Sequence, residues 1–138
     1  NNGATLKKFG KLIGQLVAEE GVNEKMAEFI TPIAILGDQM TKFTTEIGFK
    51  GFQNPDEVGA AAVDYLRVAG HMVFGYLFAR MAQVALREIA AGNTDPFYVG
   101  KVQTARFYFA KLFPETATLM RTARTGSKVL MDTDAALA

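Results

Sequence analysis

Asp64, Arg67 and His71 are the side chains whose types and spacing in this sequence could do chemistry. They are separated by steps of three and four residues, so on a helix they would share one face and could pair in turn. A histidine near a carboxylate can transfer protons, and neighbouring basic side chains can hold an anion. The alternative, which we favour, is a structural hydrogen-bond cluster at the point where a helix passes from solvent into the core.

The surroundings of His71 favour that structural alternative. Residues 68–79 form a run of twelve mostly apolar residues around the histidine. A membrane-spanning helix needs about 20 such residues, so the run suits a buried helix and we expect no membrane span. We expect a neighbour on an adjacent helix to hold the imidazole.

Recognised catalytic motifs are missing from the sequence. It contains no glycine-rich nucleotide-binding loop, no serine nucleophile elbow and no HExxH zinc motif. With one histidine and no cysteine, disulfides, thiolate metal sites and histidine-rich metal sites are excluded. We therefore expect no catalytic, cofactor-binding or metal-ligating residue in this segment. The lack of cysteine also fits a reducing compartment, and we expect a cytoplasmic protein.

A basic stretch near the C-terminal end is the second feature that could bind a partner. Between positions 101 and 128 six basic residues stand against one acid, Glu115. Arg121, Arg124 and Lys128 are spaced to lie on one helix face, which is usually a solvated surface. Two alternatives are a docking face for another, acidic domain and contact with a phosphorylated cofactor. The net charge of only +1 gives no reason to expect nucleic acid as a partner.

Helical periodicity dominates the chain and predicts an all-α protein with four helices, over about 4–20, 23–47, 56–91 and 96–124. Gly21, Gly48 with Gly51, Gly92 and Gly126 are expected to end them, and Asn54 and either Thr94 or Asp95 to cap two of the starts. Pro32 and Pro114 interrupt apolar patterns that continue in register on both sides. This continuity predicts kinked second and fourth helices.

The third predicted helix changes its polar side along its length, because Asp64 and Arg80 point in nearly opposite directions at 100° per residue. Different neighbours should therefore cover its two ends, and its centre should be covered all round. Short connections predict an antiparallel up-and-down four-helix bundle, formed by residues 1–138 as one domain. The tail after Gly126 is expected to fold back over one end.

Three stretches resemble the extra C-terminal domain of one acyl-CoA dehydrogenase subgroup, which includes the enzymes acting on 3-methylmercaptopropionyl-CoA. They begin NPDEVGAAAVDYLRVAG, DPFYVGKVQTARFYFAKLFP and GSKVLM. The resembling residues are Tyr65, Leu66, Gly70, Phe97, Tyr98, Lys101, Ala105, Phe107, Tyr108, Pro114, Gly126, Leu130 and Met131. These are packing residues, and the resemblance covers nearly the whole chain. The opening NNGATLKK, without Met, also suggests a piece of a longer protein.

The resemblance implies a parent flavoprotein that uses FAD to dehydrogenate an acyl-CoA thioester, with electron-transfer flavoprotein as acceptor. In that family the flavin site and the catalytic glutamate belong to upstream domains, so no glutamate of this segment matches the motif. The implied role is a non-catalytic module that packs on the upstream domains of its own chain and supports a homo-oligomer. The alternative is a stand-alone interaction or ligand-binding bundle with a pocket at its glycine-lined centre.

Overall fold

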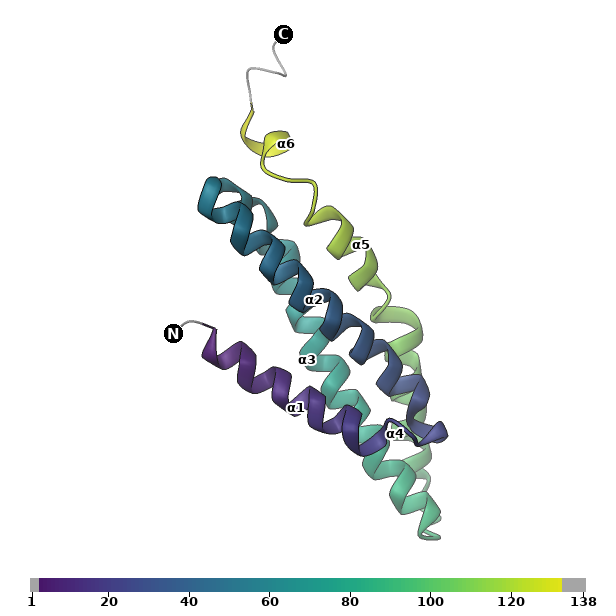
Figure 1. Cartoon of the computed structure of the whole chain (residues 1–138). Coiled ribbons are helices and arrows are strands. Elements are labelled where there is room, and N and C mark those ends of the chain that lie inside the picture. Colours follow the sequence, from purple (N-terminus) through teal and green to yellow (C-terminus); the bar gives the residue numbers. More distant parts are fainter. Residues whose placement is uncertain (1–2, 133–138) are drawn as a thin grey trace.

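The computed structural model describes residues 3–132, and in that part every regular element is helical (Figure 1). The helices are α1 (Ala4–Glu20), α2 (Ala27–Gln53), α3 (Asp56–Ala90), α4 (Pro96–Phe107), α5 (Glu115–Thr122) and α6 (Lys128–Met131). A 3-10 turn, Glu24–Met26, precedes α2, and a π-helical segment, Tyr108–Leu112, follows α4. The all-α prediction is confirmed.

The long helices reverse direction one after another, and α3 lies at the centre of the packing (Figure 1). α2, α4 and α5 all contact α3, while α1 packs mainly on α2. The largest fully buried side chains are Leu16, Met26, Phe29, Ile33, Phe43 and Val68. They come from three consecutive helices and the turn between two of them, so the core depends on contacts between elements.

α2 is longer than its glycines suggest. It continues through Gly48 and Gly51 to Gln53, and the amide of Asn54 still donates to the carbonyl of Lys50 at 2.8 Å. The prediction that these glycines end the helix is wrong. The helix stops at Asn54, which is extended (φ −147°, ψ 107°), because a residue before proline is disfavoured in the helical region. Pro32 lies inside α2, and the helix is continuous across it.

The predicted caps are confirmed. The Asn54 side chain accepts a hydrogen bond from the amide of Asp56 at 3.1 Å at the start of α3, and Asp95, not Thr94, accepts from the amide of Phe97 at 2.9 Å. Gly92 and Gly126, at the expected ends, have positive φ values of 90° and 83°.

The fourth predicted helix is interrupted rather than simply kinked. α4 gives way to the π-helical segment, in which the amide of Phe113 donates to the carbonyl of Tyr108 at 2.9 Å, and α5 begins just after Pro114. Proline has no amide hydrogen and would collide with the carbonyl four residues earlier. The wider π turn takes up this mismatch ahead of the proline.

Different neighbours cover the two ends of α3, as the change of polar side predicts. Asp64 accepts a hydrogen bond from Thr122 of α5, and Arg80 pairs with Glu19 of α1. The prediction of complete cover at the centre is wrong, however. Val73, Phe74 and Leu77 are 41%, 56% and 53% exposed, so the neighbouring elements leave part of this surface open.

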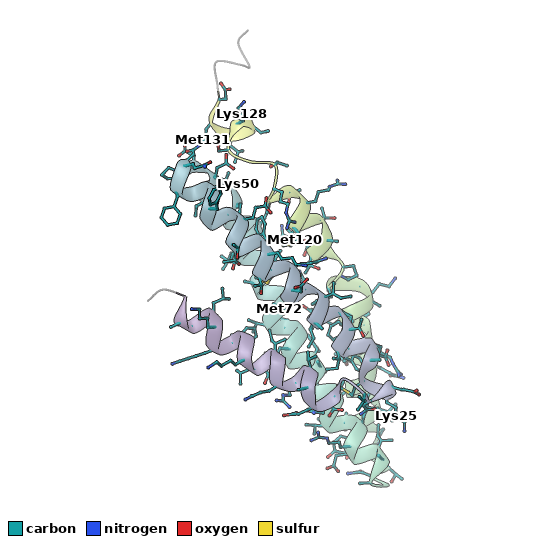
Figure 2. All side chains as sticks on the ribbon, viewed as in Figure 1. Lys25, Lys50, Met72, Met120, Lys128 and Met131 are labelled. Atoms are coloured by element: carbon teal, nitrogen blue, oxygen red, sulfur yellow. The ribbon has the colours of Figure 1, made fainter. Side chains whose placement is uncertain are left out.

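The end of the described chain folds back toward the start of α3. The amide and hydroxyl of Ser127 donate to Glu57 at 3.1 and 2.5 Å. Figure 2 shows Lys128 and Met131 of α6 at the same end of the molecule as Lys50 of α2. Up to residue 132 the predicted return of the tail is seen only at Ser127, because Val129, Leu130 and Met131 of α6 are 79%, 64% and 59% exposed, and positions 133–138 lie outside the described residues.

Candidate functional site

His71 is held between two side chains from the segment that follows α4. Its Nδ1 lies 2.9 Å from the hydroxyl of Tyr108, in the π-helical segment, and its Nε2 lies 2.8 Å from a carboxylate oxygen of Glu115, at the start of α5. The hydroxyl of Tyr108 also lies 3.1 Å from the backbone carbonyl of His71. The expectation that an adjacent segment holds the imidazole is therefore met.

This geometry satisfies the imidazole in either protonation state. An ionised carboxylate only accepts hydrogen bonds, so Nε2 carries the hydrogen directed at Glu115. In the neutral ring, Tyr108 donates to Nδ1. In the charged ring, Nδ1 donates to Tyr108, whose own hydrogen turns to the carbonyl of His71. Rotation of one hydroxyl therefore keeps both ring nitrogens hydrogen-bonded.

The two partners of His71 have perturbed acidities. The hydrogen bond from His71, followed by the positive charge of Arg67, holds the pKa of Glu115 below its ordinary value of 4.5. Burial raises the pKa of Tyr108 to about 12, so its hydroxyl stays protonated at neutral pH. The cluster thus combines a carboxylate that only accepts with a hydroxyl that keeps its hydrogen.

Of the three predicted cluster residues, Arg67 and His71 share one partner in the structure, and Asp64 has a different one. Arg67 pairs with Glu115, whose other oxygen accepts from His71. Asp64 accepts from Thr122 at 2.8 Å. The expected pairing along one helix face is wrong because α5 brings a carboxylate within reach of both basic groups. The one sequence signal that could have pointed to Glu115 as a partner of these basic groups is that it is the sole acid between positions 101 and 128.

Aromatic rings close the inner side of this cluster. The ring of Tyr108 stacks on Phe78 with centroids 4.4 Å apart, and Phe113 meets the imidazole edge-on at 6.5 Å. Tyr108 is buried, and neither of the two hollows described below is lined by His71, Tyr108 or Glu115. Such an arrangement can tie α3 to the segment after α4, but it leaves little room for a substrate.

A second polar cluster ties the end of α1 to α3. Glu20 is buried and accepts from Gln83, from Asn23 at 2.8 Å and from Arg87 at 3.0 Å. Burial acts to raise the pKa of Glu20, but these hydrogen bonds outweigh it, and the net shift is downward. Sequence reasoning did not single out these residues, because their pairing depends on contacts more than 60 positions apart along the chain.

The predicted basic face is only partly free. Arg124 is engaged, with Glu46 at 3.2 Å and with the ring of Phe43 beneath its guanidinium. Arg121 and Lys128 are exposed and form no ion pair among residues 3–132. A shallow hollow of about 380 Å³ between α2 and α5 includes Arg121 and Arg124 in its lining. The free charge of this face therefore comes from Arg121 and Lys128.

A larger hollow, of about 700 Å³, lies between α1, α2 and α3, where Figure 2 shows Met72. Gly10 and Gly37 contribute no side chain to it: a Cβ at Gly10 would meet nothing within 4 Å, and one at Gly37 would meet only the Met72 methyl at 3.7 Å. Lys7 is the charged residue of its otherwise mostly apolar lining. We call this hollow the α1 groove.

The predicted pocket at the glycine-lined centre of α3 is not formed around Gly75, although Ala69, Met72 and Val73 of the same centre line the α1 groove. A Cβ on Gly75 would lie 2.9 Å from the Phe113 ring and 3.0 Å from an Ile33 methyl, so this glycine is used for close packing. Within the described part of the chain, no three His, Asp or Glu side chains are grouped to hold a metal ion. The same part contains no helix that is both long enough and apolar enough to cross a bilayer.

The chain is similar to a known protein family and to a known enzyme. Residues 9–134 match the family model described as acetyl-CoA dehydrogenase C-terminal like. The broad-specificity linear acyl-CoA dehydrogenase FadE5 of Mycobacterium tuberculosis is 31% identical over 83 residues, which are 58% of this chain and 14% of that protein. The matched part is thus a small fraction of the relative's length.

Proposed function

Because this chain belongs to the acyl-CoA dehydrogenase C-terminal family, we propose that it serves as a non-catalytic helical module that packs on a dehydrogenase body and supports its assembly. The observation that carries the proposal is the family match over residues 9–134. The site geometry agrees with it, since the polar clusters of His71 and Glu20 both join helices together. A module of this kind needs rigid contacts between its elements more than reactive groups.

The parent reaction in this proposal is the α,β-dehydrogenation of an acyl-CoA thioester, with FAD bound by upstream domains of the same chain and electron-transfer flavoprotein as acceptor. The support is the family membership and the relative, which is named as an acyl-CoA dehydrogenase. The packing residues of the resembling stretches support the 3-methylmercaptopropionyl-CoA subgroup. The cysteine-free composition supports a cytoplasmic location.

We further propose that residues 1–138 fold as one domain, a four-helix bundle. Its four helical rods, which we call arms, are α1, α2, α3 and the run from α4 through α5. The second arm is bent at Pro32 and the fourth near Pro114. The reversal of direction between consecutive arms supports this description (Figure 1). In this arrangement the predicted docking face, Arg121, Arg124 and Lys128, lies on the last arm and on α6. Arg121 and Lys128 would supply the charge that meets an acidic surface of the body.

Binding in trans tests the proposal. A full-length dehydrogenase of this family is produced without the segment, the 138-residue chain is added, and sedimentation and thermal unfolding are measured. Association with a rise in the melting temperature of the body is expected, because binding to the folded state stabilises it. An absence of association at any concentration would contradict the module.

A charge reversal tests the proposed docking face separately from the proposal that the chain is a module of the dehydrogenase. Replacing Arg121→Glu together with Lys128→Glu is expected to weaken association, whereas the same change in charge at Lys8 and Lys11 of α1 is expected to leave it unchanged. Association that resists the first pair of substitutions would reject the basic docking face and leave the module in place.

The α1 groove supports a second candidate function, a stand-alone ligand-binding bundle. Its mostly apolar lining and the single ammonium of Lys7 fit an elongated apolar ligand with one negative end. A native gene product near 15.0 kDa, free of flavin, would support this candidate over the module. A much longer, yellow product would remove it.

A further inference from the structure

We propose that the exposed face of α3 pairs antiparallel with the same face of a second copy of this chain. The face follows heptad spacing, with alternating steps of four and three residues along three and a half heptads, and its one charged member is Arg80. Its members, which we call the α3 stripe, are Gly59, Val63, Leu66, Gly70, Val73, Leu77, Arg80 and Val84. This partner goes beyond the proposed function, which concerns the dehydrogenase body.

The α3 stripe is exposed while the opposite side of the helix is buried. Val63, Leu66, Leu77 and Val84 are 70%, 72%, 53% and 55% exposed. The positions directly across the helix, Ala61, Val68, Gly75 and Ala82, are all buried in the core. A helix that is apolar on all sides is normally buried on all sides. Among the described residues α1 reaches the edge of the stripe, where Glu19 pairs with Arg80 and Val73 lines the α1 groove, and the rest of this side of α3 is open to a partner.

The stripe is complementary to itself in one antiparallel register. In antiparallel coiled coils each a position meets a d position of the other helix. Placing Leu66 against Leu77 of the partner subunit also sets Gly70 against Val73 of the partner subunit, and Gly59 against Val84 of the partner subunit. The remaining pair sets Val63 against Arg80 of the partner subunit, whose charge is already paired with Glu19 of its own chain. Each glycine then faces a valine, so a hole on one helix meets a knob on the other.

The glycines of the stripe leave space for this approach. A Cβ added to Gly59 or to Gly70 would meet nothing within 4 Å, so neither glycine is needed for packing inside the chain. At the end of the stripe the same register places Arg87, which pairs with Glu20 at 3.0 Å and is 66% exposed, opposite Asp56 of the partner subunit, so that its guanidinium would lie between two carboxylates. The two-fold symmetry repeats this pair at the other end.

Charges beside the stripe are already neutralised within the chain. Arg67 on one edge pairs with Glu115, and Arg80, inside the stripe, pairs with Glu19 at 2.8 Å. Between these two arginines the stripe carries no charge. An apolar face whose bordering charges are paired favours another apolar protein face over an anionic lipid surface or nucleic acid.

Sedimentation velocity of the 138-residue chain tests the pairing. A dimer that forms reversibly between about 1 and 200 µM is expected, and Leu77→Lys should raise its dissociation constant at least about 100-fold, because each dimer would bury two unpaired charges. Ile35→Lys is the matched control, because Ile35 on α2 is 54% exposed and lies outside the stripe. Circular dichroism of both variants verifies that the fold is kept.

Cross-linking tests the register, and the absence of native cysteine makes it simple. A mixture of Leu66→Cys and Leu77→Cys chains should form mixed disulfides, while each chain alone, and a mixture of Ile35→Cys with Leu77→Cys, should form few. A monomer at all these concentrations, a dimer insensitive to Leu77→Lys, or preferred disulfides between two copies of Leu66→Cys would each overturn the proposal. A monomer whose binding to the dehydrogenase body is lost in Leu77→Lys would assign the stripe to that body instead.

Discussion

Removal of one hydroxyl, by Tyr108→Phe, tests the structural role of the His71 cluster. The substitution keeps the buried ring and its stacking on Phe78, but it removes the group that lies 2.9 Å from Nδ1 of His71. Everything else in the cluster, including the contact between His71 and Glu115, stays in place. The change in stability therefore reports the hydroxyl alone.

The expected cost follows from the two contacts of the hydroxyl. A neutral hydrogen bond contributes about 1 kcal/mol net, and a buried group left unpaired costs about 1–3 kcal/mol. Because Nδ1 of His71 keeps no other partner in the described structure, we expect Tyr108→Phe to lower the free energy of unfolding by about 2 kcal/mol. The substitution Tyr98→Phe removes no such hydrogen bond, because the hydroxyl of Tyr98 makes none among the described residues.

Urea denaturation followed by circular dichroism measures this difference. Tyr98→Phe is the matched control and should change the free energy of unfolding by less than about 0.5 kcal/mol. A double-mutant cycle with His71→Phe should show a coupling of about 1 kcal/mol between the two positions. If Tyr108→Phe costs no more than Tyr98→Phe, or if the cycle shows no coupling, the structural interpretation of the cluster is refuted.

Three further substitutions test the acid, packing and capping assignments. The folded-state pKa of Glu115 lies below 4.5, so its stabilising contribution is present above that pH and is lost as the pH falls through the folded-state pKa. Glu115→Gln should therefore flatten the acid limb of a plot of unfolding free energy against pH. An acid limb that the substitution leaves unchanged would contradict this assignment. Gly75→Ala would press a methyl against Phe113 and should lower the melting temperature. Gly14→Ala has nothing within 4 Å of its Cβ and should raise the melting temperature, because it removes about 1 kcal/mol of helix penalty. A shift of the same sign in both variants would contradict the packing assignment. Asp95→Ala removes the cap of α4 and should cost about 1 kcal/mol in a denaturant titration, while Asp95→Asn, which also caps, should cost much less.

Local signals in the sequence were sufficient for much of the fold. The apolar spacing of α1 gives its bounds, and Asn54 and Asp95 cap the helices they were expected to cap, because these effects act within one or two turns. The end of α2 was missed because Gly48 and Gly51 only weakly oppose a helix, so that α2 continues through them to the residue before Asn54 and Pro55.

The candidate site was less accessible from the sequence, because its pairs are long-range. Glu115 reaches His71 across 44 positions, and no local pattern distinguishes it from a surface acid. The exposed side of α3 was missed because its local pattern is clear but points to the wrong conclusion. Its apolar stripe resembles a core face in the sequence, and only the positions of the other helices show that residues 3–132 leave most of it exposed.

Deletion of this segment from a full-length dehydrogenase of the family is the most direct test of the non-catalytic module. Flavin content and the turnover number per folded subunit should be retained, while the melting temperature and the assembly of subunits should fall. A truncated enzyme that keeps its stability and assembly but loses turnover would contradict the account, because the segment would then contribute to the chemistry and not to the packing.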